Sequence, residues 1–355
     1  MTIYWLLFAA SVPGIFVDPQ LKSFFSKLSW RALVVICIFV VGLRYRVGCD
    51  WQNYADLYEA IRTNSDFGLS RLTAIFSWGP AFLGLNWLSA QLGLGVYFVN
   101  LVCAGISIGG LATFCRRLSI PWLGWTIATP YFIVVVTMGY TRQSVAIGLF
   151  LGALNLLQDR KVLRYIGVIL VATMFHASAL VLLPLALTPW FREQPRKYIS
   201  IFVLVIIFLG LILGPDAYRQ IQGYIDTNRV SYGAIVRSLM TIIPALFLFT
   251  FRRSLAQLSK AMEVWYLLSL ASVLLFFSVW LISTPTDRIS LYLIPIQIFV
   301  WASLPIIPSF NRFQTLVKSS LVLYSASILW VWTSFGLNSR CWMPYQNLFF
   351  KSGIF

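Results

Sequence analysis

Apolar residues occur along the chain in runs of 14 to 25 residues, and short segments that hold most of the charges, prolines and glycines separate these runs. An α-helix of about 20 apolar residues is long enough to cross the hydrocarbon core of a bilayer. The pattern therefore predicts roughly ten to twelve transmembrane or re-entrant helices. The runs lie at about residues 2–17, 30–43, 72–92, 95–114, 121–138, 142–157, 163–187, 198–213, 235–251, 264–282, 289–307 and 314–334.

Two of these runs are interrupted and do not read as simple membrane-crossing helices. Gly79-Pro80 breaks the run at 72–92, and His176 with its small neighbours breaks the run at 163–187. Irregular backbone at membrane depth is tolerated where it lines a cavity enclosed by protein or filled with water. We expect the first run to lie along or dip into one face, and the second to enter and return as a short hairpin.

Composition narrows the class of protein. Of the 355 residues, 59% are hydrophobic and only 11% are charged, and the mean hydropathy is +0.81. Soluble domains carry about 25% charged residues, so a water-soluble globular enzyme is excluded. We predict an all-α fold with residues 1–355 forming a single polytopic membrane domain.

The charge distribution predicts an orientation. Lys and Arg number 27 and Asp and Glu number 11, which gives a formal net charge of +16. Because the basic residues lie in short gaps between apolar runs, they fit the positive-inside rule, and nucleic acid is not a predicted partner. One side would hold 16 basic and four acidic residues, and the other side 11 and seven. The gaps assigned to the cytoplasmic side lie near residues 22–31, 116–117, 160–164, 192–197, 252–260 and 312–318.

This orientation requires that neither interrupted run crosses the membrane as a simple helix. The alternative is that one basic cluster, such as Arg116-Arg117, violates the rule.

Absent motifs exclude several chemistries. Five cysteines without CxxC spacing and a single histidine cannot form a Cys/His metal site, so no metal is predicted. The chain lacks an acidic DxD pair and both common nucleotide-binding glycine motifs, which disfavours an ATPase or a nucleotide-sugar transferase. We predict no cofactor. Cys49 and Cys341 would share the outer side and can pair, although their spacing does not demand it.

Under this orientation several arginines gather at the outer side. Arg44, Arg46, Arg142 and Arg288 lie at the ends of apolar runs, where a guanidinium needs an anion or the interface. Because guanidinium groups match phosphate oxygens, these four can bind a diphosphate. The alternative is interfacial anchoring or ion pairs with neighbouring acids such as Asp50.

The single histidine is a candidate catalytic group. His176 lies between two apolar stretches, and an imidazole can accept a proton from a sugar hydroxyl. Asp50 is the rival base. A histidine that only satisfies a backbone carbonyl, or an aspartate that only pairs with an arginine, would give the same pattern.

Aromatic residues accompany this polar set. Flat rings with a polar edge suit sugar rings, but membrane proteins also place Trp and Tyr in interfacial belts. Both interpretations remain open for these residues. The candidates for sugar binding are Trp51, Tyr54, Tyr58, Trp342 and Tyr345.

These pieces resemble the EpsG-type members of the Wzy-like exopolysaccharide and O-antigen polymerases. The matching segments are Gly48-Cys49-Asp50-Trp51-Gln52-Asn53-Tyr54, Thr141-Arg142-Gln143-Ser144-Val145-Ala146, Phe175-His176-Ala177-Ser178-Ala179-Leu180, Asp287-Arg288 with Tyr292, and Trp342 with Pro344-Tyr345. Two features depart from the family pattern. Cys49 stands where the family often has Thr, and 67–71 lacks the acidic residue that the family often has before the run at 72–92.

The resemblance implies a GT-C-like glycosyltransferase of the bacterial inner membrane with its active site facing the periplasm. Such a protein would transfer a growing glycan from undecaprenyl diphosphate onto a lipid-linked repeat unit without a metal. Its partners would be that lipid-linked oligosaccharide, membrane lipid and a chain-length regulator. Arg142 and Arg288 would stabilise the leaving diphosphate, with Arg44 and Arg46 next, and His176 or Asp50 would be the base.

Other functions share part of this pattern. A flippase or transporter for lipid-linked oligosaccharide needs cationic residues but no base. A membrane ligase would share the arginines and the histidine, and an O-acyltransferase would use a histidine facing a cytoplasmic acyl donor. The sequence leaves the sugars, the linkage, the stereochemical outcome and the oligomeric state open.

Overall fold

The computed structural model describes residues 1–63, 78–191, 193–207, 233–281 and 283–350, and these residues form helices and loops without a β-strand. Residues 195–207 are helical. The named helices are α1 (Thr2–Ala9), α2 (Val12–Val17), α3 (Phe24–Gly42), α4 (Trp51–Thr63), α6 (Pro80–Gln91), α7 (Gly95–Cys115), α8 (Pro121–Ala128), η1 (Thr129–Val136), α9 (Thr137–Gly139), α10 (Thr141–Gln158), α11 (Val162–Phe175), η2 (Ala177–Trp190), α13 (Ala234–Thr250), α14 (Arg252–Ala256), α15 (Met262–Ser278), α16 (Ser283–Ser290), η3 (Leu291–Leu293), α17 (Ile294–Ser303), η4 (Leu304–Ile306), η5 (Asn311–Phe313), α18 (Gln314–Phe335), η6 (Ser339–Trp342) and η7 (Leu348–Phe350).

The helices confirm the all-α polytopic membrane fold. Within the described residues, five helices are long and apolar enough to cross a membrane, and five more apolar helices are 10 to 17 residues long. These ten fall on predicted apolar runs. The parts of the predicted runs at 72–77 and 208–213 lie outside the described residues.

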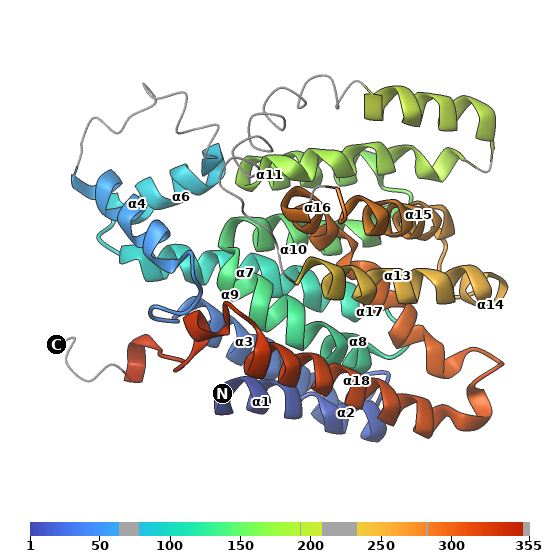
Figure 1. Cartoon of the computed structure of the whole chain (residues 1–355), viewed down its shortest axis with the longest axis horizontal. Helices are drawn as coiled ribbons and strands as arrows, with labels where there is room; N and C mark the ends of the chain where they lie inside the picture. The colour runs from blue at the N-terminus through green and yellow to red at the C-terminus, as the bar shows by residue number, and fades with distance from the viewer. Residues whose placement is uncertain (64–77, 192, 208–232, 282, 351–355) are drawn as a thin grey trace.

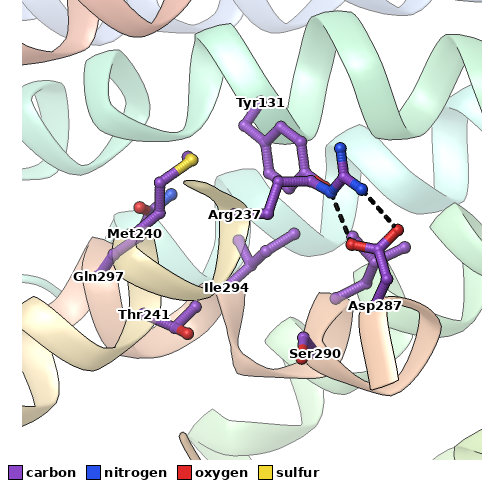
Figure 2. Close-up of a pocket in the computed structure, with 9 residues that line it drawn as sticks. Tyr131, Arg237, Met240, Thr241, Asp287, Ser290, Ile294 and Gln297 are labelled. Carbon is purple, nitrogen blue, oxygen red and sulfur yellow. Dashed lines mark hydrogen bonds and ion pairs between the residues drawn. The ribbon is translucent and has the colours of Figure 1, made fainter. Parts of the chain in front are cut away.

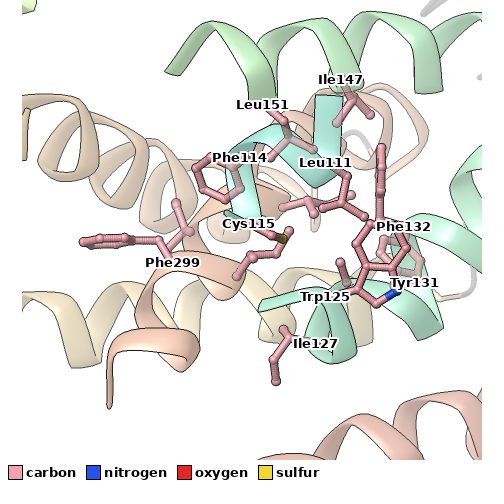
Figure 3. Close-up of a cluster of buried hydrophobic side chains, with 14 of the residues drawn as sticks. Leu111, Phe114, Cys115, Trp125, Ile127, Tyr131, Phe132, Ile147, Leu151 and Phe299 are labelled. Carbon is pink, nitrogen blue, oxygen red and sulfur yellow. The ribbon is translucent and has the colours of Figure 1, made fainter. Parts of the chain in front are cut away.

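Two of the long helices form the centre of the bundle. In the most apolar 18-residue stretch of Pro121–Gly139 every residue is buried, and in that of Pro285–Ile306 89% of the residues are buried. In the corresponding stretch of α3 only 22% of the residues are buried. A helix that is apolar on all sides belongs inside other helices or in lipid. Figure 3 shows side chains of this buried cluster, among them Phe114, Trp125 and Phe299, which come from three different helices.

The helices α3, α7, α10 and α11 lie side by side in that order (Figure 1). The approach of α7 to α10 is close because glycines face backbone there. A Cβ atom on Gly110 would lie 1.9 Å from the carbonyl oxygen of Gly148, and one on Gly148 would lie 2.5 Å from Cα of Ser107. This contact fixes α10, whose first turn carries Arg142.

One end of the bundle, here called the basic end, collects clusters that were predicted to share a side. Arg117 forms a two-contact ion pair with Asp159, with distances of 2.7 and 2.9 Å. Arg160 and Glu193 are 3.1 Å apart. The Arg117 contact places the Arg116-Arg117 cluster at the same end as the cluster after α10, so this grouping needs no exception for that cluster.

The interrupted run at 163–187 forms a hairpin. α11 starts at the basic end, the chain turns at His176, and η2 returns along α11, where the Tyr165 hydroxyl donates to the Leu182 carbonyl at 2.7 Å. Both limbs run between the turn at His176 and the ion pair of Arg160 with Glu193. At 1.5 Å per residue, α11 is about 21 Å long. The hairpin is therefore longer than the short one expected.

The described part of the run at 72–92 stays at the end opposite the basic end. α6 begins beside the end of α11, since a Cβ on Gly79 would lie 2.5 Å from the Met174 carbonyl oxygen. It ends just before Gly95, where α7 starts its path to the basic end. Both ends of α6 thus lie at one end of the bundle, as expected for a segment that does not cross.

The glycine contact between α7 and α10 gives a testable consequence. We expect Gly110→Ala to lower stability by about 1–3 kcal/mol, because the added methyl forces the two helices apart. The matched control is Gly109→Ala, where the added Cβ meets nothing within 4 Å. Thermal unfolding of both variants in detergent, followed by loss of the monodisperse chromatography peak, measures the difference. Equal melting temperatures for the two variants would contradict this helix contact.

Candidate functional site

A polar cavity of about 160 Å³ opens at the end of the bundle opposite the basic end. Its walls come from segments far apart in the sequence: the start of α4 and the residue before it, the start of α6, the start of α10, the tip of the hairpin and α16. The lining residues are Asp50, Asn53, Tyr54, Trp78, Tyr140, Arg142, Gln143, His176 and Arg288. The cavity thus brings together five of the predicted site residues: Asp50, Tyr54, Arg142, His176 and Arg288.

Two arginines supply positive charge to the cavity. Arg142 lies over the ring of Trp78 at 4.7 Å, and Arg288 lies over the ring of Tyr140 at 4.6 Å. Contact with an aromatic face restrains a guanidinium without adding a negative charge. Arg142 is in the first turn of α10, whose N-terminus carries a partial positive charge that also favours an anion.

The position of Arg288 depends on neighbours that the sequence reasoning missed. The Gln143 side-chain amide donates to the Arg288 carbonyl oxygen at 2.7 Å. Arg237 in α13 donates to Asp287 through two nitrogens, at 2.5 and 2.9 Å (Figure 2). These contacts link α16 to α10 and to α13. Arg237 stands at the start of an apolar run, as the chosen arginines do, and this signal could have identified it.

The carboxyl group of Asp50 lies just before α4 and faces the same cavity. Burial raises the pKa of Asp50, while the positive charges of Arg288 and Arg142 oppose that rise. A carboxylate with a raised pKa beside cationic groups is suited to accept a proton from a hydroxyl.

His176 occupies the turn of the hairpin and reaches the cavity wall. Its Nδ1 atom is 2.6 Å from the Ser178 hydroxyl, which is 3.0 Å from the hydroxyl of Tyr292. Burial lowers the pKa of His176, and Coulomb repulsion by Arg142 and Arg288 lowers it further. The histidine is therefore held by a chain of two hydroxyl groups and faces two cations.

Arg44, which the sequence suggested for diphosphate binding, is not among the residues that line the cavity. Its side chain is only 1% exposed. It donates to the Val47 carbonyl at 3.2 Å, the Val41 carbonyl at 2.6 Å and the Thr141 hydroxyl at 2.7 Å. The guanidinium therefore holds the loop after α3 against the start of α10. Its role in this structure is to position the neighbours of Asp50 and Arg142.

The other predicted arginine, Arg46, also lies outside the cavity lining. Its side chain is exposed and lies 5.3 Å from the ring centre of Tyr45. Gly48 follows with φ +97°, and a Cβ there would lie 2.1 Å from the Met138 carbonyl oxygen, so only glycine fits. The loop thus turns Arg46 outward and continues inward to Asp50.

The predicted sugar-binding aromatic residues divide into two groups. Tyr54 lines the cavity, whereas the other four are not among its lining residues. Trp51 and Tyr58 are buried on α4. The Trp342 indole donates to the Val134 carbonyl at 2.9 Å, and the Tyr345 hydroxyl donates to the Val40 carbonyl at 2.8 Å. These last two side chains dock the C-terminal segment onto the bundle.

The C-terminal segment covers the loop that leads to Asp50. Cys49 and Cys341 form a disulfide, and this settles the pairing that the sequence left open. The Gly48 amide donates to the Cys341 carbonyl at 2.9 Å, and the Leu348 amide donates to the Leu43 carbonyl at 2.9 Å. The disulfide thus joins residues 292 positions apart and holds the C-terminal segment against the loop that leads to the cavity.

The cavity lining carries two arginines against one aspartate, so it favours an anion. Within the residues that the structure describes, no three His, Cys, Asp or Glu side chains are grouped so that they could hold a metal ion. The arrangement can bind an anionic group through Arg142 and Arg288, and it presents Asp50 and His176 for proton transfer or hydrogen bonding.

Comparison with known proteins identifies a family. The family model described as the EpsG family matches residues 27–347, which includes every cavity-lining residue. Comparisons with curated proteins and with solved structures gave no match.

The two placements of Arg44 and Arg46 differ in their consequence for stability. We expect Arg44→Ala to lower the yield of folded protein sharply, because each buried carbonyl left unpaired costs about 1–3 kcal/mol. Arg46→Ala removes the same charge from the same loop and is expected to keep the wild-type melting temperature within a few degrees. Thermal unfolding in detergent measures both. A stable Arg44→Ala protein would show that the guanidinium does not hold the loop.

Proposed function

We propose, because the chain belongs to the EpsG family, that it is a polysaccharide polymerase. It would be a GT-C-like, Wzy-like membrane glycosyltransferase that transfers a growing glycan from undecaprenyl diphosphate onto a lipid-linked repeat unit. The observation that carries this proposal is the convergence of Arg142, Arg288, Asp50 and His176 on one cavity. Anion-binding groups beside proton-accepting groups match a donor with a diphosphate leaving group and an acceptor with a hydroxyl.

The proposed step joins two sugars and releases lipid diphosphate. An acceptor hydroxyl oxygen attacks the anomeric carbon of the donor glycan, and the bond from that carbon to the diphosphate oxygen breaks. The electron pair of this bond passes to the diphosphate, whose growing negative charge Arg142 and Arg288 stabilise. The hydroxyl proton passes to Asp50 or His176. Because the arginines supply the positive charge, we propose a metal-independent reaction.

The disulfide supports a periplasmic active site. Disulfides persist in oxidising compartments and are rare in the cytosol. Cys49 directly precedes the cavity residue Asp50. The basic end lies at the opposite end of the bundle, which agrees with the positive-inside rule. Both observations favour a bacterial inner-membrane protein whose cavity faces the periplasm, where lipid-linked repeat units are polymerised.

The cavity supports a narrower set of ligand contacts than the sequence predicted. Arg142 and Arg288 remain proposed for the diphosphate, and Tyr54 remains for a sugar ring. The structure offers Arg44, Trp342 and Tyr345 other partners, so the proposal does not include them. A chain-length regulator remains a proposed partner, for which the cavity carries no information.

A reconstituted assay tests this function. Purified protein in nanodiscs, given its cognate lipid-diphosphate repeat unit and a chelator, is expected to give a ladder of longer lipid-linked glycans. Arg142→Ala is expected to reduce the rate by at least about 100-fold, because it removes charge stabilisation of the leaving group. Arg62→Ala is the matched control, since this exposed arginine on α4 pairs with Glu59 and does not line the cavity.

Other results would overturn the proposal. A single unextended product band from folded wild-type protein would exclude a polymerase. Movement of the intact lipid-linked unit between leaflets would instead indicate a flippase. Transfer to a different acceptor would indicate a ligase, and transfer of an acyl group would indicate an O-acyltransferase. A wild-type rate for Arg142→Ala would place the diphosphate elsewhere.

A further inference from the structure

The hydrogen bonds that link Nδ1 of His176 to Ser178 and Tyr292 determine which ring nitrogen carries the proton. Nδ1 contacts the Ser178 hydroxyl at 2.6 Å, and the same hydroxyl contacts the Tyr292 hydroxyl at 3.0 Å. Two contacts need two hydrogen atoms. A hydroxyl can donate one hydrogen and accept two, and a neutral imidazole has one nitrogen that donates and one that accepts.

Tyr292 sets the direction of this chain. Its side chain is only 1% exposed. In the described part of the chain, its hydroxyl forms a hydrogen bond with the Ser178 hydroxyl. A buried donor left without an acceptor costs about 1–3 kcal/mol. The Tyr292 hydrogen therefore goes to the Ser178 oxygen.

The hydrogen of Ser178 is then available for Nδ1 of His176. If Nδ1 carried its own hydrogen, the three groups would hold three hydrogens for two contacts. The Ser178 hydrogen would then need a third acceptor, and no such acceptor contacts this hydroxyl among the described residues. The arrangement that satisfies every donor makes Nδ1 an acceptor.

We infer that His176 is neutral with its proton on Nε2, and that it donates a hydrogen bond into the cavity instead of accepting a proton. Nδ1 is engaged by Ser178, so Nε2 is the ring nitrogen left for the cavity that His176 lines. Burial of the ring, and then repulsion by Arg142 and Arg288, disfavours the doubly protonated form. Ser178 and Tyr292 are positioning residues that select the tautomer.

This assignment gives the two candidate bases different roles, and that part rests on the proposed glycosyl transfer. Asp50 accepts the proton of the attacking hydroxyl as the new bond to the anomeric carbon forms. His176 donates through Nε2–H to the diphosphate oxygen that receives the electron pair of the broken bond. The imidazole thereby joins Arg142 and Arg288 in stabilising the leaving group.

The tautomer is measurable without any substrate. His176 is the only histidine in the chain, so protein labelled with ¹⁵N-histidine and purified with a histidine-free tag gives the signals of one ring. In wild type at neutral pH we expect a protonated Nε2 and an unprotonated Nδ1. In Tyr292→Phe, the Ser178 oxygen no longer accepts a hydrogen bond from the hydroxyl of residue 292, so it is free to accept one from Nδ1 of His176. We therefore expect a larger fraction of the Nδ1–H form. A wild-type signal from the Nδ1–H tautomer or from imidazolium would overturn the inference, whatever the enzyme's activity.

Kinetics of two amide variants separate donation from proton acceptance. The side-chain amide introduced by His176→Gln can place an N–H near the Nε2 position but cannot act as a base, and the shorter amide introduced by His176→Asn lies near the Nδ1 position. We expect His176→Gln to keep its rate within about tenfold of wild type and His176→Asn to lose about 100- to 1,000-fold, as for loss of a transition-state donor. Equal, severe losses in both folded variants would contradict the donor role.

The pH dependence of activity distinguishes Asp50 from His176 as the base. Asp50 must be ionised to accept a proton, so activity is expected to fall as the pH drops through its raised pKa. The other cavity groups near the imidazole are Arg142, Arg288, Tyr54 and Tyr140, and arginine and tyrosine side chains do not titrate in the acidic range. The acidic limb should therefore persist in His176→Gln. Loss of that limb in His176→Gln would identify His176 as the base.

Discussion

The contacts of the buried Arg44 guanidinium join the two parts of the chain on which the cavity depends. One part is the loop that ends at Asp50, and the other is the start of α10, which carries Arg142. In water these loop carbonyls would find solvent, whereas inside a membrane protein the chain itself must supply their partners. A single side chain with several donors in a rigid plane meets this need. The placement of Asp50 relative to Arg142 thus depends on a residue that does not line the cavity.

Rigid contacts of different kinds support the elements that carry the cavity residues. The glycine contact fixes α10 against α7, the ion pair between Arg237 and Asp287 fixes α16 against α13, and the hydroxyl chain behind His176 fixes the hairpin turn. Helices supply the direction of each group, and short polar contacts supply its final orientation. This division suits a membrane enzyme, because apolar packing alone is too uniform to specify the angle of a guanidinium or an imidazole.

The sequence was sufficient to predict the fold class and more than half of the residues that line the cavity. Polar residues at the ends of apolar runs are costly, so Asp50, Arg142, His176 and Arg288 stood out against a chain with few charges. The direction of each side chain was not predictable. Periodicity places Arg44 and Trp342 at the correct end of the bundle, yet it cannot show that one faces backbone carbonyls and the other packs beneath the C-terminal segment. Arg237 was not predicted as a site residue because its partner Asp287 is 50 residues away in the sequence.

The link between Cys49 and Cys341 has a consequence for the order of biogenesis. The first cysteine follows α3 and the second follows α18, so the cross-link can form only after the last long helix has been synthesised. Until then, the loop before Asp50 lacks the contacts that the C-terminal segment makes with it. A nascent or truncated chain would therefore carry every cavity-lining side chain, while the loop before Asp50 would lack the covalent link that holds it. Support of this loop thus depends on the last residues of the chain to be synthesised.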